Sequence, residues 1–260
     1  MCPFSENPPP AHVDFSICGT SQHMRYIAVL NRSKKVTNAD VQVMTQACYQ
    51  QLERHAAVAW GRVPCPVIFH ADPATVPDNA EQIVLFDSPT EAGALGYHTE
   101  TPDGRIYGRV FCNPVLNAKG GTVLEGAMSV SSVLSHEVLE QFIDPDINLW
   151  YEDAYGKLYA GEVGDPVEAD VYVVMVGKKT VAVSNFVFPE WFDSENRKGT
   201  RFDQMGRLKK PFTMTAGGYM VVKDKGRDQE VYARSYPEWK KPGKTHVAAR
   251  TARRKAKKSA

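Results

Sequence analysis

A histidine and two glutamates occur at spacings on which a metal site can be built. They are His136, Glu137 and Glu140, within the run HEVLE. Residues four apart on a helix lie on one face, so His136 and Glu140 can reach a single cation. Glu137 directly follows His136, so its side chain lies beside the two ligands on the helix surface. From there its carboxylate can take a proton from a water beside the metal without binding the metal itself. The pattern predicts two metal ligands and, in Glu137, the general base of a hydrolytic site.

The same residue types also fit a solvated helix face, because glutamate is a strong helix former. Three features of the surrounding sequence favour a site instead. Residues 128–135 before the motif are small and apolar, a hairpin is predicted upstream, and the segment GEVGDP follows at 161–166. A solvated face requires none of these features.

Two predicted elements position the motif. Apolar residues recur at helical spacing over 124–142, and Asp144-Pro145 ends this helix. Upstream, residues 94–98 and 106–112 flank the turn formers TPDG at 101–104, which predicts a β-hairpin. The hairpin places an exposed strand edge before the motif helix.

The rest of the chain predicts an α+β fold with extra β hairpins towards the C-terminus. The predicted elements are strands over 23–31, 67–69, 82–86, 171–176 and 180–187, a helix from Thr37 or Asn38 to about Trp60, and a further hairpin within 207–222. We expect an irregular N-terminal arm over 1–22, a single domain over 23–236 and a disordered basic tail over 237–260.

Over residues 97–192 the sequence resembles the zincin metallopeptidase-like proteins. It is most similar to bacterial and phage proteins in which a HExxExxxDP helix precedes an E-x-G-D segment. The helix motif reads HEVLEQFIDP from His136 to Pro145, and the later segment runs from Gly161 to Asp165. The resemblance implies a zincin-like mixed sheet, a long N-terminal helix and a central metal-site helix. It also implies a third ligand on the later segment, either Glu162 or Asp165.

Glu140 departs from the peptidase pattern, because active zincins of the usual kind carry a second histidine there. The departure predicts a peptidase that is weak or inactive. One imidazole with two or three carboxylates is a harder ligand set, so we expect zinc first, with manganese, iron or calcium as alternatives. Added carboxylate charge also raises the pKa of water bound to the cation.

Several neighbouring residues have two readings. Asp144 can extend the ligand face by another turn, or it can end the helix through local hydrogen bonds, which we favour.

In zincins the strand before the active helix pairs with an extended substrate, and the resemblance assigns this role to 106–112. The alternative is an ordinary edge strand. The residues for which a packing or surface role is favoured are Tyr155, Tyr159, Tyr172, His55, His70, His98 and His246.

Cysteine content and hydropathy indicate the compartment. The five cysteines form no CxxC pair, and Cys48, Cys65 and Cys112 each lie in an apolar stretch, as core residues do. No signal peptide or run of about 18 apolar residues is visible, which predicts no membrane partner. We expect a cytoplasmic protein, or a virion component if the chain is of phage origin.

Charge is unevenly distributed along the chain. Nine of the 31 basic residues lie in the tail 240–260, which holds no acid, and the remaining 22 face 30 acidic residues in the body. Such a tail can contact nucleic acid or an acidic surface, or it can simply be a solubilising end.

Three hypotheses follow from the sequence. The first is a metal-dependent peptidase. The second is a non-enzymatic phage virion or assembly protein on a zincin-like scaffold. The third is an acidic fold stabilised by calcium.

Overall fold

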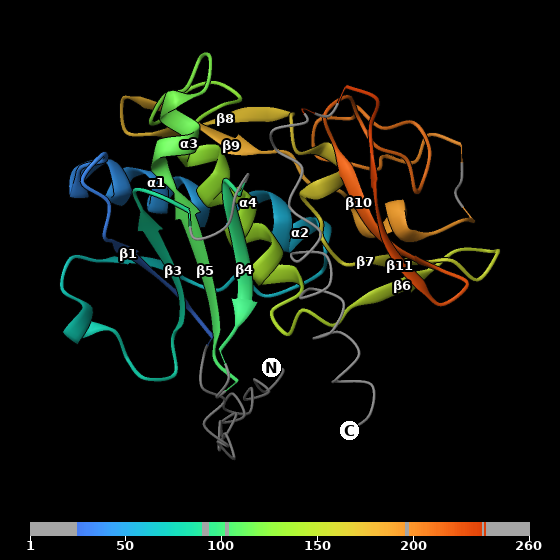
Figure 1. Ribbon diagram of the computed structural model, residues 1–260, viewed down its shortest axis with the longest axis horizontal. Helices are drawn as coiled ribbons and strands as arrows, with labels where there is room; N and C mark the ends of the chain where they lie inside the picture. Colours follow the sequence, from blue (N-terminus) through green and yellow to red (C-terminus); the bar gives the residue numbers. More distant parts are fainter. Residues whose placement is uncertain (1–24, 90–93, 102–103, 196–197, 236, 238–260) are drawn as a thin grey trace, which may run out of the picture.

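The computed structural model describes residues 25–89, 94–101, 104–195, 198–235 and 237 (Figure 1). The predicted arm 1–22 and almost all of the predicted tail 237–260 lie outside these ranges. Within them, no helix combines the length and the apolar character needed to cross a membrane.

The N-terminal half forms a five-stranded mixed sheet in the order β2-β1-β3-β5-β4. Its strands are β1 (Ile27–Asn31), β2 (Val67–His70), β3 (Glu81–Phe86), β4 (Gly96–Glu100) and β5 (Ile106–Phe111). The first three strands and β5 run parallel, whereas β4 runs antiparallel to β5 at the edge. The structure therefore confirms the α+β class, the short apolar strands and the hairpin before the motif.

The first long helix is confirmed over nearly its whole predicted length. Thr37 caps α1 (Asn38–Gln51) by accepting a hydrogen bond from the backbone of Asp40. The helix continues through a π-helical turn into α2 (Ala57–Ala59). A second, short helix, α3 (Cys112–Asn117), follows β5.

The motif helix α4 (Val130–Ile143) is shorter than predicted. Ser129 caps it with a capping box, so the six residues from Leu124 to Ser129 precede the helix instead of belonging to it. Gly126 there has a φ of +80°, a conformation that a helix does not contain. At the other end Arg62 donates hydrogen bonds to the carbonyls of Phe142 and Ile143.

The C-terminal half adds two smaller sheets, and three short 3₁₀ turns are distributed over the two halves of the described chain. A four-stranded sheet has the order β11-β10-β7-β6, and β8 pairs with β9 as a separate hairpin. The strands are β6 (Trp150–Glu152), β7 (Leu158–Ala160), β8 (Val171–Val176), β9 (Lys179–Ser184), β10 (Tyr219–Asp224) and β11 (Arg227–Tyr232). The 3₁₀ turns are Pro73–Thr75, Asp165–Val167 and Pro189–Phe192.

The prediction of a hairpin within 207–222 is wrong in position. The hairpin begins at Tyr219 and turns at Lys225 and Gly226, both of which have positive φ. Such a two-residue turn matches the twist of the paired strands. The sequence pattern does not reveal β11, because most of its residues are polar. An edge strand need not be apolar.

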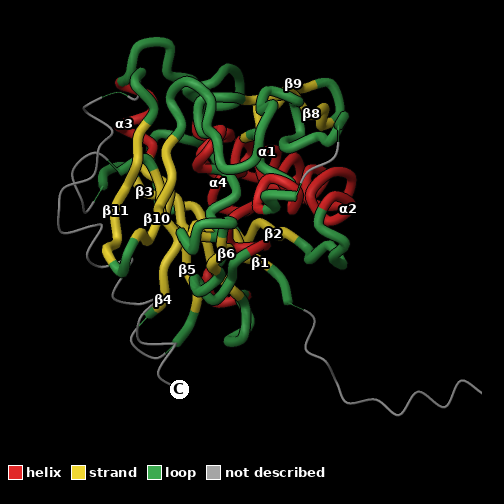
Figure 2. Tube along the Cα trace, turned by 90° about the vertical axis from the view of Figure 1, so that its right-hand side faces the viewer, coloured by secondary structure: helices red, strands yellow, loops and turns green. Residues whose placement is uncertain are grey.

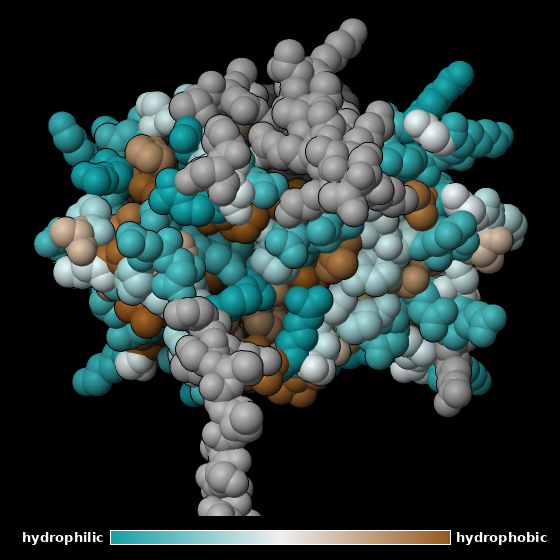
Figure 3. All heavy atoms as spheres, turned by 90° about the horizontal axis from the view of Figure 1, so that it is seen from below, coloured by the Kyte–Doolittle hydropathy of each residue, from teal (hydrophilic) through white to brown (hydrophobic). Residues whose placement is uncertain are grey.

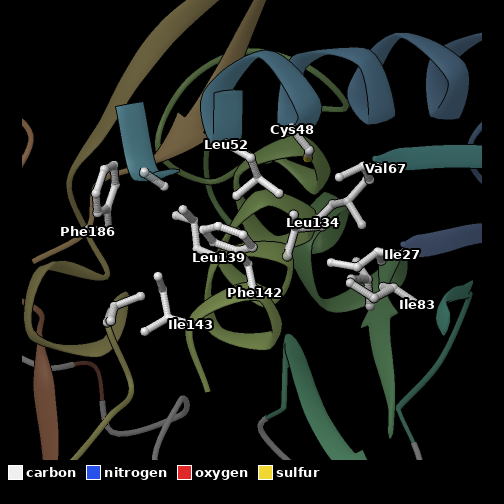
Figure 4. Close-up of a cluster of buried hydrophobic side chains, with 14 of the residues drawn as sticks. Ile27, Cys48, Leu52, Val67, Ile83, Leu134, Leu139, Phe142, Ile143 and Phe186 are labelled. Atoms are coloured by element: carbon white, nitrogen blue, oxygen red, sulfur yellow. The ribbon is translucent and has the colours of Figure 1, made fainter. Parts of the chain in front are cut away.

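Helices α1 and α4 lie between the main sheet and the β8–β9 hairpin (Figure 1, Figure 2). Figure 4 shows Leu134 and Leu139 of α4 among buried side chains from both sides of this helical layer. Hydrogen bonds fix the layers together: Ser131 donates to the carbonyl of Ala182 at 2.8 Å, and Ser135 accepts from the backbone of Ser184 at 2.6 Å. Helix α4 is therefore held from several sides.

The expected core role of the cysteines is confirmed for the three that the structure describes. Cys48, Cys65 and Cys112 are buried and free. Burial raises the pKa of the Cys65 thiol to about 11, which makes it a poor nucleophile. Figure 3 shows one face of the molecule as mainly hydrophilic, with hydrophobic side chains in small separate groups.

Candidate metal centre

Six titratable side chains from three segments converge beside α4. The cluster consists of His98 from β4, His136, Glu137 and Glu140 from α4, and Glu162 and Asp165 from the segment after β7. The His136 side chain is 12% exposed and the Asp165 side chain only 1%. All five residues that the sequence singled out for the site are thus brought together in the fold.

Strand β4 forms one wall of the cluster. A Cβ atom at Gly96 would lie 2.5 Å from Oε1 of Glu137, so the missing side chain lets this carboxylate approach the strand closely. Alternate residues of a strand face the same side, so His98 projects towards α4 as Gly96 does. The hairpin therefore supplies a histidine to the site.

The segment after β7 forms the opposite wall. Gly161 donates a backbone hydrogen bond to Leu149, which starts the segment beside the end of α4. A Cβ at Gly164 would lie 2.5 Å from Nδ1 of His136, so the backbone here packs directly on the imidazole. The 3₁₀ turn that begins at Asp165 then turns the chain away.

A first group of ligand atoms lies around His136. Its Nε2 is 3.2 Å from Oε1 of Glu140 and 3.3 Å from Oδ1 of Asp165. Ligand atoms bound to one tetrahedral zinc at about 2.0–2.1 Å lie about 3.3 Å apart. His136, Glu140 and Asp165 therefore have the mutual spacing of a cation's ligands.

A second group lies around His98. Its Nδ1 is 3.5 Å from Oε2 of Glu140, and its Nε2 is 3.9 Å from Oε2 of Glu162. Each of these three residues offers a ligand atom within 4.8 Å of the others, and all three are buried. Glu137 lies next to this group, with Oε2 3.8 Å from Nδ1 of His98.

Burial and mutual charge shift the pKa values of the cluster in opposite directions. For His136, burial opposes protonation, but Glu140, Asp165 and Glu137 outweigh it and raise the pKa well above its ordinary value. For Glu140, burial favours the neutral acid, but the imidazoles of His136 and His98 hold the pKa well below its ordinary value. Burial raises the pKa of Glu137 despite both imidazoles, as suits a proton acceptor near neutral pH.

The carboxylates lower the protonation cost of His98 in the same way. Burial opposes protonation of its imidazole, but Glu162, Glu137 and Glu140 outweigh burial and raise the pKa well above its ordinary value. When protonated, the two histidines thus supply positive charge that balances the buried carboxylates. A divalent metal ion supplies the same compensation more strongly.

Three buried polar atoms of the cluster have no hydrogen-bond partner among the described residues. They are Nε2 of His98, Oε2 of Glu137 and Oε1 of Glu140. A buried polar atom without a partner costs about 1–3 kcal/mol, so such atoms at one place call for an explanation. A bound cation would satisfy them, and the buried histidine–glutamate cluster can hold a metal ion. Nitrogen and oxygen donors of this kind suit zinc, manganese or iron.

His98 is the site residue that the sequence reasoning missed, since it has no partner at ligand spacing along the chain. The available signal was its place in the predicted hairpin. Gly96, His98 and Glu100 share one face of β4, and that face meets the motif helix.

Asp144 has the structural role that we favoured. Its carboxylate accepts hydrogen bonds from the backbone of Asn148 and Leu149 just beyond α4. Two of the tyrosines form hydrogen bonds with residues outside the cluster. Tyr159 donates to Asp153, and the hydroxyl of Tyr172 bonds to Gln51 and His55. Tyr155 is 95% exposed.

The expectation that 106–112 forms an exposed edge is wrong. Strand β5 is hydrogen-bonded to β3 on one side and to β4 on the other. The hairpin folds β4 back onto the free side of β5, so β4 becomes the edge. A strand with both sides paired has no backbone groups left for an added peptide.

We compared the chain with protein-family models, with curated proteins and with solved structures, and none of these comparisons found a match.

Proposed function

We propose that the chain is a metal-dependent hydrolase of the zincin type that acts on peptide bonds. The observation that carries this proposal is the convergence of His136, Glu140 and Asp165, with separations of 3.2 and 3.3 Å. The mixed sheet, the long first helix and the central motif helix are consistent with a zincin-like fold. Asp165 belongs to the group around His136, which favours it over Glu162 as the third ligand of this cation.

Each residue has a distinct part in such a reaction. A divalent cation held by the three ligands would polarise the substrate carbonyl and lower the pKa of water. Glu137, next to the ligands and with a raised pKa, would accept the proton of the attacking water and deliver it to the leaving amine. Glu140 makes the ligand set more anionic than two histidines would, so we expect slow turnover.

Strand β4 would bind the substrate in place of β5. It is the last strand in the order of the described sheet and carries His98 into the cluster, so a peptide paired along this edge would lie close to the metal. Backbone hydrogen bonds to an edge strand accept most sequences, which predicts broad specificity.

The test combines metal analysis with a cleavage assay on the full chain. Glu137→Gln should retain the metal of the wild type and lose hydrolysis of an unfolded protein substrate by at least a hundredfold. His136→Ala should lose metal and activity together. The exposed Glu125, just before α4, gives the matched control Glu125→Gln, which should change neither. Equal cleavage by wild type and Glu137→Gln would refute the assigned base.

A second function has its own observation. The ligand side chains of Glu140 and Asp165 are only 2% and 1% exposed, and closed sites of this kind are typical of structural metals. A cation there would hold α4 and the segment 161–165 together in a non-enzymatic virion or assembly protein. Glu137→Gln would then leave every measured property unchanged.

The basic tail 240–260 lies outside the described residues, so its contact with nucleic acid or an acidic surface stays a prediction. Deleting it should abolish such binding, measured by retention on duplex DNA at low and high salt.

A further inference from the structure

The carboxylate of Glu140 faces two different imidazoles. Its Oε1 lies 3.2 Å from Nε2 of His136, whereas its Oε2 lies 3.5 Å from Nδ1 of His98. A carboxylate that binds one cation with both oxygens directs them to a single point. Here the two oxygens are directed towards the two groups of ligands, which is the arrangement of a bridging carboxylate.

The two imidazoles belong to separate ligand groups. His136 groups with Glu140 and Asp165, whereas His98 groups with Glu140 and Glu162, and within each group the ligand atoms lie within 4.8 Å of one another. Only Glu140 is common to both. One cation bound by His136 and Asp165 would therefore leave the His98 group without its own.

Atoms of the second group have the character of unused ligands. His98 is 7% exposed, and its Nε2 has no hydrogen-bond partner among the described residues although it is directed towards Glu162 at 3.9 Å. Nearby, Oε2 of Glu137 is also buried without such a partner. A separation of 3.9 Å is too long for a hydrogen bond, and one ligand atom from each of His98, Glu140 and Glu162 lies within 4.8 Å of the others.

Charge balance leads to the same result. The four buried carboxylates Glu137, Glu140, Glu162 and Asp165 carry four negative charges when ionised. One divalent cation at the first group would leave two of these negative charges without a compensating metal. Two divalent cations with neutral imidazoles balance the four charges fully, and buried charges are costly unless they are balanced.

We infer that the site holds two divalent cations, one in the group of His136 and Asp165 and one in the group of His98 and Glu162, with Glu140 as the bridging ligand. This inference rests on the metal centre of the proposed function and adds a second cation to it. Paired cations about 3.5–4 Å apart can stabilise both the attacking and the leaving atoms of a displacement. The oxygen-rich set with one imidazole per ion suits manganese, iron or zinc.

The experiment counts manganese ions on the full chain after chelation and dialysis. Calorimetric titration with Mn²⁺ should give two ions per chain for the wild type and one each for His98→Ala and His136→Ala. Glu140→Gln should weaken both sites at least tenfold. His70, which bonds to Thr75 on β2 outside the cluster, gives the control His70→Ala, which should still bind two. Circular dichroism verifies that each variant is folded, and His98→Gln replaces His98→Ala if the latter is not.

A spectroscopic measurement distinguishes a bridged pair from two distant sites. Two Mn²⁺ ions that share Glu140 should give an exchange-coupled electron paramagnetic resonance spectrum, and His98→Ala should convert it to the six-line spectrum of a single ion. One ion per wild-type chain, or two ions without coupling, would overturn the inference while leaving the proposed hydrolase intact. No bound ion would overturn both, and a coupled pair without peptide cleavage would support the inference but not the peptidase.

Discussion

On one side of α4, Leu134 and Leu139 are fully buried in the main hydrophobic core (Figure 4). On the other, Glu137 and Glu140 are almost as deeply buried but face imidazoles and further carboxylates. The apolar side gains stability from burial itself, whereas the charged side loses it unless its charges are balanced. The same helix thus carries a stabilising surface and a surface whose buried charges need compensation.

This difference marks the charged side as the candidate functional side. An apolar side chain in the core needs only a space of the right size, but a buried carboxylate needs specific partners. Helix α4 can hold its acids in place because hydrogen bonds and packing on its other side fix it to β9 and the main sheet.

The largest expected effect is that of the metal on stability. Protein saturated with Mn²⁺ or Zn²⁺ at about a thousand times the dissociation constant should be more stable than the chelated form by about 4 kcal/mol for each bound ion. The measurement is the free energy of unfolding in urea with and without metal. Glu140→Gln should reduce this difference by about 1.4 kcal/mol or more for each ion, and a wild type indifferent to metal would contradict a cation on the charged side.

The next effect concerns the apolar side. Leu139→Ala should destabilise the protein by about 2–5 kcal/mol, because it opens a cavity at a fully buried position. Metal stoichiometry should stay as in the wild type, since Leu139 packs in the core (Figure 4). Loss of metal from the folded variant would mean that the two sides of α4 are not independent.

Two glycines of the segment after β7 separate an effect on packing from an effect on metal binding. A Cβ at Gly164 would meet the His136 ring at 2.5 Å, whereas a Cβ at Gly161 would meet the Cβ of Leu149 at 2.8 Å. Each change to alanine should cost about 1–3 kcal/mol through overpacking. Only Gly164→Ala should also weaken metal binding, at least tenfold by calorimetry. Equal metal affinities in the two variants would show that the position of the His136 ring does not matter.

The smallest effect is a pH dependence of the metal-free protein. The folded pKa values of His98 and His136 lie well above 6.5, so their stabilisation is complete below that pH and is lost as the pH rises through the folded values. The depressed pKa of Glu140 adds stability above pH 4.5 that is lost on acidification. Urea denaturation should therefore show highest stability between these values and a decline towards alkaline pH. Bound metal should remove the alkaline decline, and an unchanged decline would contradict metal binding by the imidazoles.

Local signals predicted much of the fold. Thr37 and the apolar spacing after it located α1, and the turn formers at 101–104 located the β4–β5 hairpin. Local signals failed at two boundaries. The Ser129 capping box starts α4 later than the apolar spacing predicts. The last hairpin begins only at Tyr219, because its second strand is polar and the sequence pattern does not reveal it.

The sequence by itself determined the helical part of the site. The i to i+4 spacing places His136 and Glu140 on one face wherever the helix packs, because helix geometry is local. Only the tertiary structure decided that His98 joins them, that Asp165 and Glu162 belong to different ligand groups, and that β4 is the sheet edge. These features depend on strand pairing and on the close packing at Gly96 and Gly164, which join segments far apart in the chain. No spacing along the sequence encodes such contacts.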